Sequence, residues 1–283
     1  DTVLSPAITF FGQLFFQPVT ENGIFRKDYV QSEKKNLIAT IEAQRNDKRA
    51  YAGGQLLKKM CSQDTFGIPR LGEAAQAKPI SARRAYDHYR KILRQSPIEL
   101  FYVGDAPPEQ IAQQLKALFA PLERDYVNLP AQTPFLDPPG GSHTETMDVT
   151  QGKLAMGFVT PITIRDPEFA AMQVCNMLFG GGMTSLLFMN IREKLSLCYD
   201  ISSGYHGSKG ILTVLAGIDC AQFDTVCQQV QAQLDLCRTG DFSDDALNAA
   251  KQAVISSLLG THDSPGAIES YYATSALSGL NMT

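Results

Sequence analysis

The sequence predicts an α+β fold of two tandem homologous domains, and three observations support this prediction. A helical pattern recurs at an offset of 217 residues: FRKDYVQSEKKNLI begins at Phe25 and FSDDALNAAKQAVI begins at Phe242. A stretch rich in proline and glycine, residues 121–142, separates the two copies. The second copy mixes helical patterns with two adjacent strand-like segments. Each domain is therefore expected to be a mostly antiparallel sheet with helices packed on one face.

The elements of the first copy can be read in order from its patterns. Residues 4–17 predict a helix, and a second, amphipathic helix follows Phe25. Asp28 falls in the first turn of this second helix, where its negative charge complements the helix dipole. After Tyr51 the sequence predicts a helix at 82–94, a strand at 98–103 and a helix at 108–119.

The second copy is predicted to begin with a strand at residues 152–160. Helices at 167–179 and 184–194 follow, then paired strands at 199–206 and 210–218. A helix at 221–238 precedes the recurring pattern, which carries Asp245 in its first turn. Aligning the copies leaves the first domain incomplete at its start and the second truncated at its end. We expect residues 1–127 to be the C-terminal part of a first domain, 128–142 a linker, and 143–283 a second domain.

Composition and charge limit the classes of function. The chain of 283 residues is 44% hydrophobic with a net charge of -4, which is typical of a globular protein. Its apolar runs are too short for a membrane span, and nothing supports nucleic-acid binding. Residues 1–120 carry 17 Lys and Arg against 12 Asp and Glu, while acidic residues are in excess in the remainder. This asymmetry fits two mutually attracting domains, separate partners, or ordinary surface variation.

The six cysteines form no CxxC pair and no metal-binding spacing with histidine. Several occupy apolar positions of the helical and strand patterns. They predict reduced thiols, and this favours a cytoplasmic location.

The segment LFGGGMTSLLFMNIREKLSLCYDISS, which starts at Leu178, is the most informative part of the chain. Gly180, Gly181 and Gly182 predict a sharp turn, either as a plain helix end or as a surface that contacts substrate. Arg192 should lie near a helix end and Tyr199 at the start of the next strand. Both side chains can hydrogen bond to peptide carbonyl groups.

This segment resembles the second domain of the insulinase/pitrilysin-type zinc peptidases, which include the mitochondrial processing peptidase. The match rests on the glycines, on IREK ending at Lys194 and on the seven-residue spacing from Arg192 to Tyr199. EKKNLIATIEAQRNDKRAYA and IELFYVGD resemble a helix and the closing strand of the first domain. The resemblance implies tandem domains of the LuxS/processing-peptidase-like metallohydrolase fold. It also implies that Arg192 and Tyr199 face the active site and hold the substrate peptide.

Active members of the family bind zinc through an HxxEH helix and a downstream Glu. None of the four histidines of this chain forms HxxEH. In the second domain the resemblance puts Met172, Cys175 and Asn176 at the motif positions. The downstream ligand, expected seven residues after Glu33, is Thr40, unless a shifted alignment brings in Glu42. We therefore assign no catalytic residue, no metal ligand and no cofactor within this chain.

Three functions remain open at this point. The first is a non-catalytic bacterial family member that cradles a peptide or protein substrate as a partner of a catalytic subunit, in a hetero- or homodimer. The second is an active zinc metalloendopeptidase whose HxxEH lies upstream of this sequence. The third is a peptide-binding scaffold without proteolysis.

Overall fold

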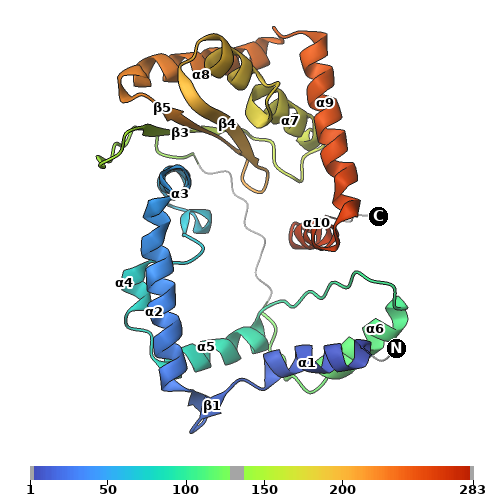
Figure 1. The fold of residues 1–283 in the computed structure, drawn as a ribbon. Coiled ribbons are helices and arrows are strands. Elements are labelled where there is room, and N and C mark those ends of the chain that lie inside the picture. The colour runs from blue at the N-terminus through green and yellow to red at the C-terminus, as the bar shows by residue number, and fades with distance from the viewer. Residues whose placement is uncertain (1–2, 128–136, 281–283) are drawn as a thin grey trace. The chain divides into compact units, whose positions relative to one another are not determined.

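The computed structural model describes residues 3–127 and 137–280, which combine helices with small antiparallel sheets (Figure 1). The described residues fall into two compact units. Unit 1 consists of residues 3–42, 71–127 and 265–275, and unit 2 consists of residues 43–70, 137–264 and 276–280. Residues 128–136 of the predicted linker lie outside the described residues. The α+β class is confirmed, whereas the boundaries at 127 and 143 stay a prediction.

Unit 1 is mainly helical. Its elements are α1 (Leu4–Phe16), the hairpin of β1 (Thr20–Glu21) and β2 (Ile24–Phe25), α2 (Lys27–Ala43), α4 (Ala74–Ala77), α5 (Ala82–Gln95), α6 (Pro108–Phe119) and most of α10 (Pro265–Leu277). The hairpin turns at Asn22 and Gly23, which both have positive φ, as a tight two-residue turn requires. Phe25 then packs 5.2 Å from the ring of Tyr86 and 5.4 Å from that of Tyr89.

The strand predicted at residues 98–103 is absent, and that prediction is wrong for the described structure. The segment lies outside helices and strands. Its apolar side chains stay partly exposed, with Leu100 at 40% and Phe101 at 36%. A strand needs a neighbour to satisfy its backbone groups. Among the described residues of unit 1, the only paired strands are the two-residue β1 and β2.

Unit 2 contains the larger sheet. Its strands are β3 (Gly152–Val159), β4 (Cys198–His206) and β5 (Ile211–Ile218). Its longer helices are α3 (Lys48–Met60), α7 (Phe169–Asn176), α8 (Phe223–Thr239) and α9 (Asp244–Leu259). Two π-helical segments, η3 (Met177–Gly181) and η4 (Leu187–Lys194), occupy part of the two predicted helices. Short 3₁₀ turns complete the unit: η1 (Gln44–Asn46), η2 (Thr65–Gly67), η5 (Cys220–Gln222) and η6 (Gly260–Asp263).

The sheet has the order β3-β5-β4 and is antiparallel throughout. Leu154, Ala216 and Ile201 lie side by side across the three strands and point into the main core. Phe179, Leu187, Ile191, Val226 and Val230 close that core from the helical side. On its opposite face the sheet is covered by α3, a helix of the first copy (Figure 1). The central strand β5 is consequently buried along nearly its whole length.

The predicted repeat has a clear counterpart in the helix boundaries. The series α2, η1, α3 spans residues 27–60, and the series α9, η6, α10 spans residues 244–277. The first residues of α2 and α9, the first residues of α3 and α10, and the last residues of α3 and α10 are therefore each separated by the predicted 217 positions. In each series the two long helices fall into different units. Most of α2 belongs to unit 1 and α3 to unit 2, whereas α9 belongs to unit 2 and most of α10 to unit 1. Within the described part of the chain, no helix has the length and hydropathy needed to cross a bilayer.

Candidate functional site

The segment between η4 and β4 brings Arg192 close to Tyr199. Ser196 adopts a positive φ of 52°, which reverses the chain directly after η4. Its amide donates to the carbonyl of Arg192 at 3.1 Å, and the amide of Leu197 donates to Ile191 at 3.0 Å. The helix end and the strand start are thus joined by a short, hydrogen-bonded turn.

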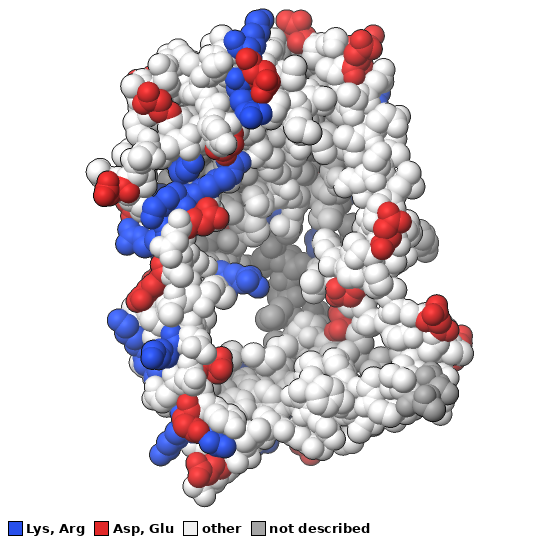
Figure 2. Space-filling view, in the orientation of Figure 1, with Lys and Arg blue, Asp and Glu red and all other residues white. Residues whose placement is uncertain are grey.

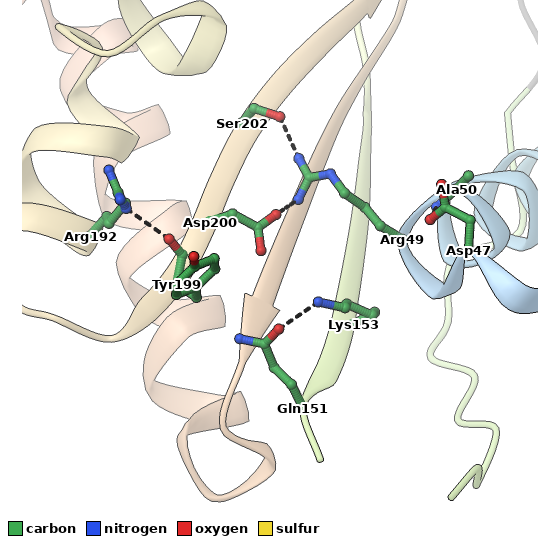
Figure 3. A network of polar contacts seen from close by, with 9 residues as sticks. All are labelled: Asp47, Arg49, Ala50, Gln151, Lys153, Arg192, Tyr199, Asp200 and Ser202. Atoms are coloured by element: carbon green, nitrogen blue, oxygen red, sulfur yellow. Dashed lines mark hydrogen bonds and ion pairs between the residues drawn. The ribbon is translucent and has the colours of Figure 1, made fainter. Parts of the chain in front are cut away.

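Arg192 makes three contacts within its own neighbourhood. Its Nε donates to the carbonyl oxygen of Tyr199 at 2.7 Å, as Figure 3 shows. One terminal nitrogen lies 3.0 Å from a carboxylate oxygen of Glu193, and the guanidinium lies 4.5 Å from the ring centroid of Phe188. Arg192 therefore fixes the backbone at Tyr199 through the carbonyl oxygen of that residue.

Tyr199 lies at an irregular point of β4. The register with β5 shifts between Cys198 and Asp200, so Tyr199 is the additional residue of a β-bulge. Bulges redirect side chains, and Tyr199 is 77% exposed. The structure places Arg192 and Tyr199 where the sequence predicts them; their role as substrate contacts stays a prediction.

A second arginine, Arg49 of α3, holds the residue after the bulge (Figure 3). Its guanidinium forms an ion pair with Asp200 and donates to Ser202 Oγ at 2.7 Å. Burial lowers the pKa of Arg49, which still remains a cation at neutral pH. Arg49 could not be identified from the sequence, because it lies about 150 residues from its partners and its counterpart in the repeat is Gly266.

Gly217 makes room for this polar cluster on the α3 face of the sheet. A Cβ atom at Gly217 would lie 2.9 Å from Gln151 Oε1 and 3.0 Å from Lys153 Nζ. Lys153 Nζ itself donates to Gln151 Oε1 at 2.6 Å. Figure 2 shows the basic side chains gathered on the left of the view with acidic side chains among them, whereas the right of the view carries almost only acidic ones.

Gly180 and Gly181 allow close packing, and Gly182 lies where the chain leaves η3. None of Gly180, Gly181 and Gly182 has a left-handed φ; Gly180 and Gly181 lie in η3, and Gly182 is extended. A Cβ at Gly180 would lie 2.6 Å from Leu187 Cδ1 and 2.7 Å from Ser203 Oγ. The glycine at 180 therefore allows η3 to approach both η4 and β4.

The far end of the β4–β5 hairpin is anchored by polar groups. Lys209 Nζ lies 2.6 Å from a carboxylate oxygen of Asp64, and both side chains are nearly buried, with 11% and 7% of their areas exposed. Burial pushes the pKa of Asp64 upward, but Lys209 and the amide of Phe66 outweigh it and hold that pKa below the ordinary 3.8. Nearby, Tyr205 donates to the carbonyl of Ile162 at 2.6 Å. Burial, with Asp166 nearby, raises the pKa of Tyr205 to about 12.

The described residues do not fit a zinc ion. They contain no group of three or more His, Cys, Asp or Glu side chains placed to hold a metal. Thr40 donates its hydroxyl to the carbonyl of Asn36 at 2.8 Å, as an ordinary helical threonine does. Asn176, at a motif position, accepts a hydrogen bond from Ser203 at 2.8 Å. We therefore derive no step through zinc in this chain.

Comparison with known proteins gives the family context of this geometry. Residues 79–254 match the model of the peptidase M16 inactive domain. The chain is 31% identical over 261 residues to the probable inactive metalloprotease YmfF of Bacillus subtilis, covering 92% of this chain and 61% of that protein. An uncharacterized zinc protease of Rickettsia felis is 22% identical over 245 residues, or 85% of this chain and 58% of that protein. The chain thus spans about three fifths of the length of these relatives.

Solved structures agree with this assignment. A conserved protein from Enterococcus faecalis superimposes with a TM-score of 0.89 at 28% identity, over 100% of this chain and 67% of that one. A peptidase M16 inactive domain from Pseudomonas fluorescens has the same fold, with a TM-score of 0.75 at 19% identity over 88% of this chain and 60% of that one. The resemblance carried by the glycine and Arg–Tyr segment is confirmed, and the chain belongs to the peptidase M16 inactive domain family.

Proposed function

We propose that this chain forms the non-catalytic, substrate-holding part of an insulinase-type zinc endopeptidase. In this proposal the side chain of Tyr199 contacts the substrate peptide, and Arg192 is a positioning residue that fixes Tyr199. One observation carries the proposal: Tyr199 is 77% exposed although Arg192 holds its carbonyl oxygen and Arg49 pairs with the side chain of the next residue, Asp200. An exposed aromatic ring on a braced backbone is ready to bind with little loss of conformational freedom.

The position of Tyr199 on β4 suits an extended peptide. β4 pairs with β5 on one side, and the described residues provide no strand on its other side. Such an edge can accept an extended chain by strand addition, while pockets and side chains select its residues. The Tyr199 hydroxyl can donate to a peptide carbonyl or accept from a peptide amide.

Catalysis in this proposal belongs to a partner. Because the described residues lack a metal-holding group, zinc and the general base would come from another subunit of the family, in a hetero- or homodimer. We place the assembly in the bacterial cytoplasm, since the relatives compared above are bacterial and the six cysteines are free.

The proposal can be tested with the full-length protein and the family subunit that co-purifies with it. Hydrolysis of a fluorogenic peptide by the complex should fall about 10²-fold in kcat/KM for Tyr199→Ala, the scale of losing one oxyanion donor. Arg192→Ala should cause a smaller fall, because it only loosens the bulge. Tyr271→Ala, which removes a tyrosine 43% exposed in α10, is the matched control. If turnover is unchanged in Tyr199→Ala and Arg192→Ala, both residues are inherited relics, and the scaffold function takes precedence.

A second candidate is an active zinc metalloendopeptidase in which the longer protein supplies its own zinc site. It is favoured by the name zinc protease given to the Rickettsia felis relative, which extends beyond the matched region. Metal analysis of the full-length protein without its partner separates the two candidates. One zinc per chain, together with peptidase activity that a chelator abolishes, would support this candidate against the first.

A further inference from the structure

An amide–amide hydrogen bond joins η4 to α8 at the core of unit 2. Asn190 Nδ2 donates to Gln233 Oε1 at 2.6 Å. Gln233 is only 6% exposed, and no other asparagine or glutamine in the described part of the chain is buried. Ile191 and Leu234, the next residues along the two helices, belong to the hydrophobic core. The pair is therefore a polar contact in apolar surroundings.

A polar pair in such a place contributes less to stability than to geometry. Burying an amide side chain is unfavourable unless it is hydrogen bonded, and two apolar side chains of similar size would suit the core about as well. Buried polar groups are better known for fixing a register, because a hydrogen bond is directional and apolar packing is not. The Asn190–Gln233 pair can thus select one arrangement of η4 among those that the core would accept.

The arrangement of η4 is unusual because this segment is wound as a π-helix. Such turns are rare and occur often at functional sites. At its end the amide of Leu195 donates to the carbonyl of Asn190 at 3.1 Å, five residues back. The carbonyl of Ile191 accepts the amide of Leu197 at 3.0 Å, in the turn that leads to Tyr199. In an α-helical register Leu195 would donate to Ile191 instead and compete with that turn.

We propose that Asn190 and Gln233 are positioning residues, which hold η4 in its π-helical register and so hold the turn that presents Tyr199. Gln233 fixes the rotation of η4 at Asn190, two residues before Arg192. Arg192 accepts the amide of Ser196 through its carbonyl and donates through Nε to the carbonyl of Tyr199. A different rotation of η4 would turn Arg192 away from both partners. The step to peptide binding rests on the proposed function, whereas the register of η4 does not.

The test replaces the pair in the 283-residue chain without leaving an unpaired polar group. Asn190→Leu combined with Gln233→Met keeps the approximate shapes, so urea unfolding should show no loss of stability. Amide exchange measured by NMR should nevertheless become about tenfold faster at Ser196 and Leu197, because their hydrogen bonds open more often. The amide of Lys209, at the other end of the β4–β5 hairpin, should exchange as in wild type.

Two further variants make the result specific to the hydrogen bond. Asn190→Gln combined with Gln233→Asn exchanges the two side chains and keeps a donor opposite an acceptor. This exchanged pair should restore slow amide exchange at the turn. Gln231→Met, which removes a hydrogen bond at the surface of the same helix, is the matched control and should leave both rates unchanged.

The consequence for peptide hydrolysis is measured in the full-length complex. The apolar pair should lower kcat/KM by less than Tyr199→Ala does, and the exchanged pair should recover it. If Tyr199→Ala lowers turnover but the apolar pair does not, the positioning role is wrong. If Tyr199→Ala itself has no effect, the proposed function fails, and amide exchange at Ser196 and Leu197 alone decides whether the pair holds the turn.

Two results on the isolated chain would overturn the inference. One is amide exchange at Ser196 and Leu197 that keeps its wild-type rate in the folded apolar pair, because the apolar core alone would then hold η4. The other concerns the wild-type chain: Nδ2 protons of Asn190 that exchange as fast as those of the exposed Asn46 would show that the hydrogen bond is not maintained. Because the second measurement needs no variant, the test stands even if the apolar pair fails to fold.

Discussion

Helices α3 and α10 occupy the same place in the two repeats but differ in what surrounds them. On α3, the residues that meet the sheet include Arg49, Gly53 and Met60. The corresponding positions on α10 are Gly266, Ser270 and Leu277, and all three are exposed, with Leu277 at 72%. A repeated helical pattern therefore determines where a helix begins and ends, but not which surface covers it.

The sequences of the two helices show why α3 suits a sheet. Gly53 brings the helix backbone close to Leu215, since a Cβ there would lie 3.3 Å from Leu215 Cδ1. Met60 fills the space above Gly157. Gly266 and Ser270 of α10 are also small, but both are exposed. The comparison predicts that equivalent changes will be costly on α3 and nearly neutral on α10.

The largest effect should come from the anchor that follows α3. In Lys209→Met, Asp64 loses the partner that lies 2.6 Å away while remaining largely buried. Removing one member of a buried pair typically costs about 3 kcal/mol of stability. Urea unfolding at pH 7 should show this loss, whereas Arg238→Met, which removes an ion pair with both side chains more than half exposed, should change stability by less than about 0.5 kcal/mol. The counterpart of Asp64 in the second repeat, residue 281, lies outside the described residues.

The ion pair of Lys209 with Asp64 predicts that the free energy of unfolding depends on pH. The pKa of Asp64 is lower in the folded than in the unfolded state, so the unfolded state binds more protons in acid. The contribution of the Asp64 carboxylate to the stability of the folded state is complete above its unfolded pKa of about 4. It is lost as the pH falls through the pKa of Asp64 in the folded state. The difference between wild type and Lys209→Met should therefore shrink below about pH 4. A difference that stays constant down to pH 2 would show that packing, and not the ion pair, holds the hairpin.

The second effect compares adjacent glycines on α3. Gly53→Leu crowds Leu215, and such overpacking destabilises a protein by up to about 3 kcal/mol. The higher helix propensity of leucine stabilises the helix by about 0.8 kcal/mol. We expect a net loss of about 2 kcal/mol in urea unfolding. Gly54→Leu places its side chain where nothing lies within 4 Å of the Cβ, so it should stabilise the chain by about 0.5–1 kcal/mol.

The matched change on α10 completes this test. Ser270→Leu should shift stability by less than about 0.5 kcal/mol, because Ser270 is exposed. If Ser270→Leu were as harmful as Gly53→Leu, α10 would be as closely covered as α3, and the contrast between the repeats would fail.

Sequence reasoning predicted the features that depend on local pattern. The repeat offset, the β4–β5 hairpin and the positions of Arg192 and Tyr199 follow from periodicity and a specific motif, and the structure contains all of them. The packing of α3 on the sheet and the ion pair of Arg49 with Asp200 could not be predicted, because they join segments about 150 residues apart. The close packing at Gly180 could not be predicted either, because the sequence does not reveal that Leu187 and Ser203 crowd it. The segment 98–103 has a strand-like sequence, but strand formation also requires a neighbouring strand.

The smallest loss expected on α3 concerns Arg49, the residue that contacts the bulge. Its ion pair with Asp200 is about one-third exposed on each side, so solvent weakens it and Arg49→Ala should cost only about 1 kcal/mol. A double-mutant cycle with Asp200→Ala should give a coupling energy of about 0.5–1 kcal/mol that decreases as salt is added. Gly266→Arg, the reciprocal change on α10, should leave stability within about 0.5 kcal/mol of wild type, because Gly266 is exposed. A coupling energy of zero would mean that α3 is held by Gly53, Met60 and their apolar contacts alone. Arg49 would then be a surface cation beside the bulge, and Arg192 would remain as the arginine that fixes Tyr199.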